Sequence, residues 1–400
     1  MKVALPLVVC LLLISSHASS QIVRENMNLM GAGARALGMG GAFIAVSDDA
    51  TAASWNPAGL AQLKKGEASG SGKFVKESWE EDDPDIEPIV QNHATLNFAS
   101  IAYPIAVGPK NLVAAVCYQR QIETYGKINT PEDPANNSFE GVRTATGGYD
   151  TFSPALGFQV TPEIMVGGTV NIWRNGTLNR WEGTGPNEGY WEERNIEISG
   201  TNLLAGVLYQ SRRLSYGAIV RSTLNLSRTV TYTDAGGTED SFDMLGIKLP
   251  AMVGFGVAFR PSSELLLAAD VDVKPYSDAK QVDPATDEET DAGFEDITQV
   301  RAGVEYLLQS GEGFVPIRLG VRTDPKTYTS FDTRRADNRG EQVIGKTYSA
   351  GLGFFKGNLS IDVVYEFSTA EIDNFYGGSF HTVTETAHAL LVSVIAHFGR

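Results

Sequence analysis

Residues 297–323 read ITQVRAGVEYLLQSGEGFVPIRLGVRT, and this stretch decides the fold class. Apolar and polar residues alternate on both sides of a glycine-rich break, which is the pattern of two β-strands that each have one apolar face. Val300 and Tyr306 share the apolar face of the first strand, whereas Arg301 and Glu305 share the other. The stretch therefore predicts a β-hairpin.

The expected turn at residues 310–313 sets a register in which Arg301 faces Arg322 across the hairpin. Like charges that face each other are unfavourable unless an anion lies between them. Two sources of such an anion are possible. A neighbouring strand can supply a carboxylate, such as Asp270 or Asp272, or an amphiphilic ligand can supply its own.

The same hairpin pattern recurs along the chain from about residue 95. Six hairpins with short turns, a strand at 67–78 and a C-terminal strand predict fourteen strands of about 10–13 residues, which suits tilted membrane strands better than a soluble sandwich. The predicted fold is all-β, a fourteen-stranded antiparallel transmembrane β-barrel. Its long outer loops are expected at 79–93, 124–149, 175–196, 226–246, 275–296, 324–344 and 369–383.

Composition and the N-terminal residues indicate an exported protein. The 400 residues carry a formal net charge of −16, which argues against nucleic acid and against anionic lipid surfaces as partners. Residues 1–20 combine a charged start, a short apolar run and small residues, as a secretory signal peptide does. Cys117 is then expected to be the one cysteine of the exported chain, without an intramolecular disulfide.

Residues 31–61 read GAGARALGMGGAFIAVSDDATAASWNPAGLA, a run too rich in small side chains to build a large core alone. Asp48 or Asp49 is expected to cap one short helix. Asn56 is expected to cap a second, with Pro57 at its first position, where a missing N–H costs nothing.

This run resembles the N-terminal segment of the long-chain fatty acid transporter (FadL/TodX) family of outer-membrane proteins, above all in Asp48-Asp49-Ala50 and in Asn56-Pro57-Ala58-Gly59-Leu60. The resemblance implies a fourteen-stranded barrel with a small N-terminal luminal hatch of short helices. The hatch is expected at 21–66 and the barrel at 67–400. Residues expected to shape and gate the hatch are Asp48, Asp49, Trp55, Asn56, Pro57, Ala58 and Gly59.

The resemblance also implies an apolar outer groove formed by the third and fourth long loops. Trp173, near a strand end, is instead expected to anchor the barrel at the membrane interface. The family's lateral exit is associated with a kink in the third strand, but residues 112–123 contain no Gly or Pro, so the sequence places no exit. The expected ligand contacts are Trp181, Tyr190, Trp191, Phe242, Met244 and Leu245, with Arg301 and Arg322 for a head group.

The expected function is passive uptake of long-chain fatty acids or similar lipophiles through the bacterial outer membrane, gated by the hatch. Partners are the hydrophobic ligand and the surrounding lipid and lipopolysaccharide. One alternative is a PorV-like shuttle or scaffold in type IX protein secretion, because such proteins have a run similar to Trp55-Asn56-Pro57-Ala58 and would bind secreted proteins. Another is a purely structural or adhesive surface barrel that uses its acidic loops.

Enzymatic activity, metals and cofactors are not expected. The chain has no G-x-S-x-G elbow and no H-E-x-x-H motif. The acidic stretches 80–87 and 283–296 lack EF-hand spacing, so they are expected to be solvated loops and not calcium sites.

Overall fold

The computed structural model describes residues 27–83, 86–130, 140–311, 313–332, 338–376 and 379–399. The predicted signal peptide lies outside these ranges. The helical elements are α1 (Ala34–Gly38), α2 (Ala52–Trp55), η1 (Pro57–Gln62), η2 (Gly185–Asn187) and η3 (Tyr276–Asp278). Within the described ranges, no helix is both long and apolar enough to cross a membrane.

The rest of the described chain is mainly strand, in nineteen pieces. These are β1 (Gly66–Glu81), β2 (Ile89–Val107), β3 (Lys110–Glu123), β4 (Gly126–Thr130), β5 (Gly141–Gln159), β6 (Ile164–Gly183), β7 (Trp191–Gln210), β8 (Leu214–Arg221), β9 (Leu224–Asp234), β10 (Glu239–Leu249), β11 (Met252–Phe259), β12 (Leu265–Lys274), β13 (Lys280–Val282), β14 (Glu289–Asp291), β15 (Ile297–Ser310), β16 (Gly313–Phe331), β17 (Arg339–Lys356), β18 (Leu359–Tyr376) and β19 (Ser379–Phe398).

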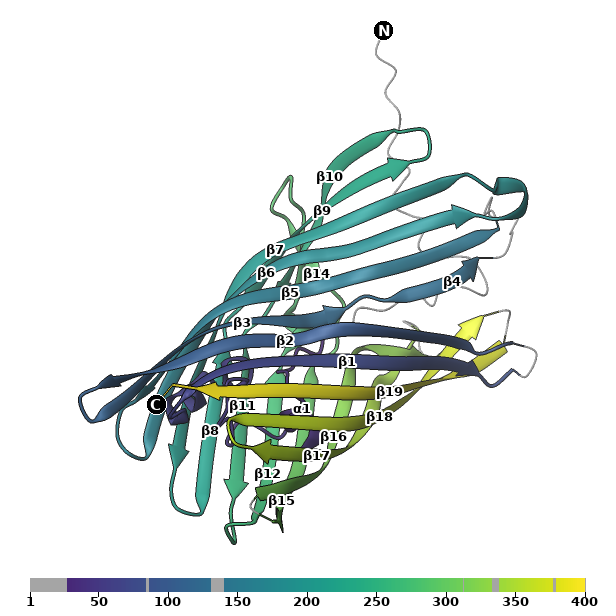
Figure 1. Ribbon diagram of the computed structural model, residues 1–400. Coiled ribbons are helices and arrows are strands. Elements are labelled where there is room, and N and C mark those ends of the chain that lie inside the picture. Colours follow the sequence, from purple (N-terminus) through teal and green to yellow (C-terminus); the bar gives the residue numbers. More distant parts are fainter. Residues whose placement is uncertain are drawn as a thin grey trace.

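All strands belong to one antiparallel sheet, which closes on itself because β1 pairs with both β2 and β19 (Figure 1). Five strands of the wall each consist of two consecutive pieces: β3–β4, β8–β9, β10–β11, β12–β13 and β14–β15. Prolines mark two of these interruptions, Pro250 before β11 and Pro275 after β12, because proline cannot donate to the ladder. The wall is therefore a closed fourteen-stranded barrel, as predicted.

The predicted hairpin at 297–323 is confirmed, since β15 pairs with β16 in the expected register. Arg301 faces Arg322 and Glu305 faces Arg318, and all four side chains are buried on the luminal side. The alternate residues of these strands point outward and are exposed; they include Val300, Tyr306, Leu308, Leu319 and Val321. An apolar outer face and a polar inner face are the arrangement of a membrane barrel.

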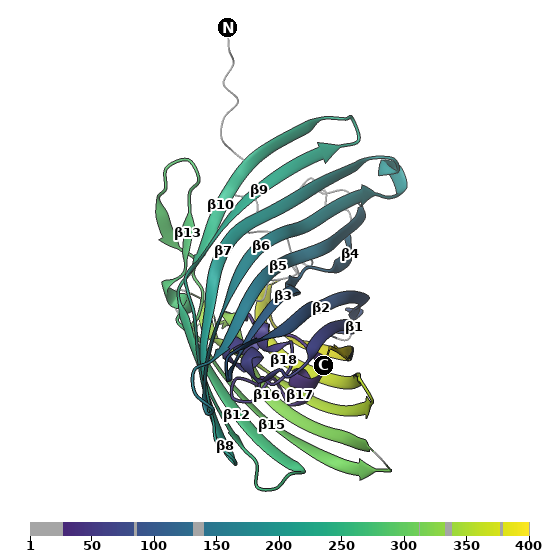
Figure 2. The same ribbon diagram turned by 60° about the vertical axis from the view of Figure 1, so that its left-hand side comes forward.

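The predicted long loops are largely wrong, because the strands continue through most of them. β5 begins at Gly141, β6 runs to Gly183, and β9 and β10 form a hairpin across 226–246. The expected strand length was set by the thickness of a bilayer. The strands are longer, because two strands with polar residues on both faces can stay paired in water beyond the bilayer. The outer ends of β5, β6, β7, β9 and β10 consequently rise well above the rest of the wall (Figure 2).

Candidate ligand-binding site

Residues 27–63, called the inner segment, lie inside the lumen (Figures 1 and 2). The second predicted cap is confirmed: Asn56 precedes η1 and its Oδ1 accepts a hydrogen bond of 3.2 Å from the backbone N–H of Ala58. The first is wrong in position. Helix α2 begins at Ala52 after Thr51, while Asp49 accepts the Thr51 N–H at 2.9 Å in a turn that precedes the helix.

Wall glycines allow the inner segment to approach the strands closely. A Cβ atom at any of them would lie within 3.0 Å of an inner-segment atom. Gly157, Gly167 and Gly206 are direct cross-strand partners, so they form one row along the lumen. This glycine collar comprises Gly157, Gly167, Gly206, Gly217, Gly256, Gly303 and Gly320.

Carboxylates of the wall hold the inner segment in place. Oδ2 of Asp270 accepts the backbone N–H groups of Phe43 at 2.6 Å and of Ile44 at 2.9 Å. Arg35 forms ion pairs with Asp48 in the inner segment and with Glu305 in the wall, the latter at 3.0 Å. Burial raises the pKa of the Asp49 carboxyl group, although nearby Arg35 opposes that shift.

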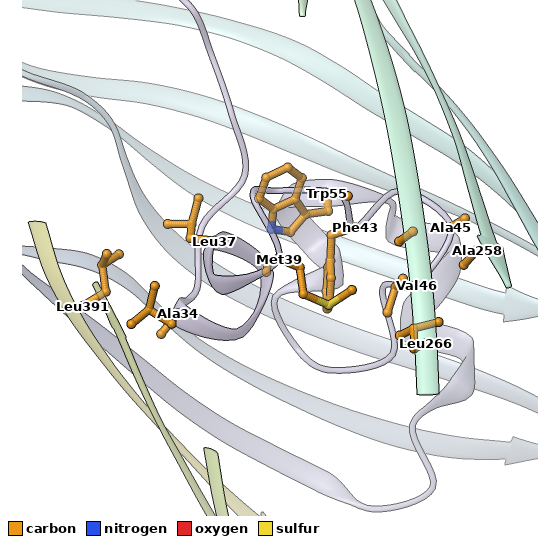
Figure 3. Packing of buried hydrophobic residues seen from close by; sticks show 14 of the residues in the cluster. Ala34, Leu37, Met39, Phe43, Ala45, Val46, Trp55, Ala258, Leu266 and Leu391 are labelled. Atoms are coloured by element: carbon orange, nitrogen blue, oxygen red, sulfur yellow. The ribbon is translucent and has the colours of Figure 1, made fainter. Parts of the chain in front are cut away.

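The packing around these anchors is apolar. Figure 3 shows Phe43 and Trp55 against Met39, with Ala258 and Leu266 contributed by the wall. Glycine backbone contacts, buried ion pairs and this apolar packing together make residues 34–62 a tightly seated plug.

We expect Asp270→Asn to lower the free energy of unfolding by about 2–4 kcal/mol, because a hydrogen-bonded charge opposite Arg301 is lost. Thermal unfolding of the purified barrel measures this effect. Asp283→Asn is the control, since Asp283 caps an outer turn and its loss should matter little. Equal unfolding temperatures for the two variants would contradict the anchoring role.

Residues 27–30 are held differently, by polar side chains that reach their backbone. Nζ of Lys274 donates to the carbonyl oxygen of Leu29 at 2.9 Å, and the Tyr276 hydroxyl donates to that of Met27 at 3.1 Å. Gln119 Nε2 donates to the carbonyl oxygen of Met30 at 2.8 Å. This short stretch has no helix or strand of its own, so a few side chains decide where it lies.

Met27 and Leu29 insert into a second apolar group, called the luminal cluster. It lies next to the plug, and both inserted side chains are almost completely buried. The wall residues come from many strands that converge at this level. They are Ile122, Tyr149, Trp173, Ile198, Leu224, Leu226, Ile247, Leu249, Met252, Tyr276, Ala279 and Ile297.

Trp173 belongs to this cluster, so its predicted role as an interfacial anchor is wrong. It is 0 % exposed, and its Nε1 donates to Asn202 Oδ1 at 2.9 Å. The alternation of β6 places Trp173 on the luminal face with Thr169 and Asn171. Its side chain therefore points into the lumen, even though its position along the strand is near the membrane interface.

Arg221 lies beside the luminal cluster and was missed from the sequence. It is 5 % exposed, and its Nε and Nη1 atoms have no hydrogen-bond partner. No described carboxylate lies within ion-pair distance of it, although Asp272 interacts with it electrostatically from further away. Its side chain lines a small cavity together with apolar residues such as Leu29 and Met252 and with the charged pair Asp272 and Arg301. A buried unpaired guanidinium is costly, so this position is suited to an anionic or strongly polar group.

The two arginines singled out from the sequence already have carboxylate partners. Arg301 contacts Asp272 at 2.8 Å and lies 3.9 Å from Asp270, and Arg322 pairs with Glu366. Of the two anions left open above, the structure shows carboxylates from the protein. Binding of a ligand by Arg301 and Arg322 stays a prediction.

Of the predicted aromatic contacts, Trp181, Trp191 and Phe242 lie on strands, and Tyr190 lies in the short connection before β7. Trp181 is on β6 and Trp191 begins β7. Because Trp181 pairs with Glu192, Trp191 projects from the opposite face of the sheet, where Arg180 stacks on it at 4.7 Å. Tyr190 packs edge-on against Trp181 with ring centroids 5.7 Å apart. The structure therefore groups Trp181 with Tyr190 and separates Trp191.

Beside the luminal cluster, the outer part of β2 is not joined to β3 and β4 by backbone hydrogen bonds. This boundary in the wall is called the seam. The pairing of β2 with β3 ends at Phe98 and Gln119, and above this point residues 89–96 pair only with β1. Strand β3 shifts register against β5 after Arg120, although it contains neither Gly nor Pro. Side chains close the seam: His93 Nε2 lies 3.1 Å from Glu123 Oε2, and Gln91 donates to the Lys127 carbonyl at 3.3 Å.

The fold and site together define a class: a fourteen-stranded outer-membrane barrel with an internal plug beside an apolar luminal cluster. Residues 11–375 match the family described as outer membrane protein transport protein (OMPP1/FadL/TodX). The chain belongs to this family. It is thus an outer-membrane transporter of hydrophobic small molecules, and because the family consists of transport channels, the prediction that it is not an enzyme is confirmed.

Solved structures support the same fold. A Pseudomonas aeruginosa FadL homologue has a TM-score of 0.63 at 14% identity, covering 94% of this chain and 100% of that one. The Pseudomonas putida toluene transporter TodX has a TM-score of 0.62 at 14% identity, covering 93% and 100%. The Ralstonia pickettii toluene transporter TbuX has a TM-score of 0.59 at 15% identity, covering 93% and 100%.

No curated protein matches the chain significantly. The PorV-like alternative gains no support from these comparisons.

Proposed function

We propose that this protein takes up long-chain fatty acids or similar amphiphiles that combine an apolar tail with an acidic head group. The observation that carries the proposal is Arg221, a buried guanidinium at the edge of the luminal cluster whose Nε and Nη1 atoms have no hydrogen-bond partner and which has no described carboxylate within ion-pair distance. A tail would replace Met27 and Leu29 among the apolar side chains. The head group would supply the anion that Arg221 lacks.

A face of the outer strands that is apolar except for Arg228 provides the route inward. Phe242 on β10 pairs with Val230 on β9, which in turn pairs with Ile196 on β7. Alternation places these side chains on one face of the sheet. Leu226, four residues before Val230, lies on the same face and belongs to the luminal cluster. Met244 extends this track on β10, whereas Leu245 follows at a register shift and is 40% exposed.

The gating element in this proposal is residues 27–30, and the rest of the inner segment stays in place. The glycine collar and wall carboxylates hold residues 34–62 by many backbone contacts. Residues 27–30 depend on a few side-chain hydrogen bonds, so they can leave at lower cost. Asp48, Asp49, Trp55, Asn56, Pro57, Ala58 and Gly59 accordingly shape the fixed plug, and their gating role is indirect.

The seam between β2 and β3–β4 is the exit that fits this scheme. Ile122 and Tyr149 belong to the luminal cluster and pair with each other at the edge of the seam. A ligand in the cluster therefore lies close to the one stretch of β3 that has lost its partner strand β2. The seam can open by losing side-chain contacts alone, because no backbone hydrogen bonds between strands have to break.

Binding of a fatty acid and of the fatty alcohol of equal chain length tests the proposal. Arg221→Gln should weaken binding of the acid by about tenfold to 100-fold, because a charged hydrogen bond is lost, and should leave binding of the alcohol nearly unchanged. Fluorescence of Trp173, next to the site, reports both.

Arg212→Gln is the control, because Arg212 is exposed in a short turn away from the lumen. Equal losses for acid and alcohol would contradict an acid-binding role for Arg221. A wild-type protein that binds neither molecule would overturn the proposed function itself.

A further inference from the structure

The outward face of β1, β19, β18, β17 and β16 carries three rows of side chains that follow directly from the strand register. The innermost of these rows is apolar and exposed, as expected for contact with lipid tails. Cross-strand pairing orders it as Phe74, Leu390, Tyr365, Ala350 and Leu319.

Two residues further out, the second row mixes aromatic and basic side chains. Lys76 pairs with His388, which pairs with Phe367, which pairs with Tyr348. The Tyr365 hydroxyl and the His388 Nδ1 atom are hydrogen-bonded at 2.6 Å. Aromatic residues in such a row mark the boundary between lipid tails and head groups.

The third row is polar and contains a second lysine. It runs through Ser78, Thr386, Thr369, Lys346 and Thr323. Lys76 and Lys346 are exposed and form no ion pair with any residue in the described ranges. They lie three inter-strand spacings apart, which is roughly 14 Å across the sheet.

Carboxylates begin one row beyond. Glu80 on β1 and Glu371 on β18 both pair with Thr384 of β19, and both are exposed. These carboxylates therefore repel an anion on the outer side of the lysines, and the apolar row excludes it on the membrane side. The lysines lie in the one intermediate band where an anion is favoured, at the level of the lipid head groups.

We propose that this lysine patch, comprising Lys76, His388 and Lys346, binds the phosphate groups of a phosphorylated glycolipid in the outer leaflet. Two unpaired cations flanked by hydroxyl groups suit a head group with more than one phosphate. The acyl chains of the same lipid would lie along Phe74, Leu390 and Leu319 below.

The test measures binding of lipid A to the purified protein by native mass spectrometry, beside lipid A from which the phosphates have been removed. The wild-type protein should retain the phosphorylated form selectively. The double variant Lys76→Gln/Lys346→Gln should bind it about 30-fold more weakly, since both cations that face the head group are lost.

Lys110→Gln/Lys356→Gln is the matched control, with the same change of charge at the short turns on the opposite rim. It should bind lipid A as the wild type does. Equal affinity of the two double variants would overturn the proposal, as would equal binding of the dephosphorylated lipid. Full competition by inorganic phosphate alone would also overturn it, because the patch would then be a site for small anions and not for a lipid.

Discussion

Replacing Gly320 with valine is expected to displace the inner segment and open the lumen to large solutes. A Cβ atom at this position would collide with the backbone of Met39 and Gly40, which cannot move aside as a flexible side chain can. Overpacking of this kind costs about 3 kcal/mol. We expect a folded barrel with a lower unfolding temperature and a large gain in permeability to bulky antibiotics.

Gly70→Val is the matched control for this experiment. Gly70 lies on β1 of the same barrel, and a Cβ atom there would meet nothing within 4 Å. Permeability and unfolding temperature should stay near those of the wild type. If the Gly320 variant behaved in the same way, the glycine collar would not be what seats the plug.

Replacing Met27 and Leu29 together with serine is expected to raise the affinity for a fatty acid by about 100-fold or more. In the resting state these two side chains occupy the luminal cluster, and a ligand must displace them. Burial of a Met or Leu side chain contributes about 1.5–3 kcal/mol each, so their loss removes most of the competition. Titration with a fluorescent fatty acid measures the change.

The volume-conserving swap Met27→Leu/Leu29→Met is the control, because it keeps the apolar contacts of the cluster. Its affinity should equal that of the wild type. A serine variant with unchanged or weaker binding would show that residues 27–30 do not compete with the ligand, and the gate would then have to lie elsewhere.

Much of the architecture could be predicted because strand patterns are local. Alternation in 297–323 determines which side chains face the lumen, and the short turn determines the register that sets Arg301 opposite Arg322. The cap at Asn56 is equally local, since the residue and its acceptor geometry lie within one turn. These features depend on neighbours in sequence.

The prediction of long outer loops was wrong for a related reason. Membrane thickness limits the apolar part of a strand but not the hydrogen-bonded part, so β6 and β7 continue outside with polar residues on both faces. Nothing in the local pattern of 175–196 separates a solvated strand from a solvated loop.

By itself the sequence determined the barrel, its strand number, the facing of strands with clear alternation such as 297–323, and the small-residue character of the inner segment. Only the tertiary structure decided which buried charges find a partner. Arg301 acquires Asp272 from the neighbouring strand, whereas Arg221 acquires none. Whether a charge is neutralised depends on side chains brought together from distant strands, and that convergence follows from closure of the barrel around the plug, not from any single stretch of the chain.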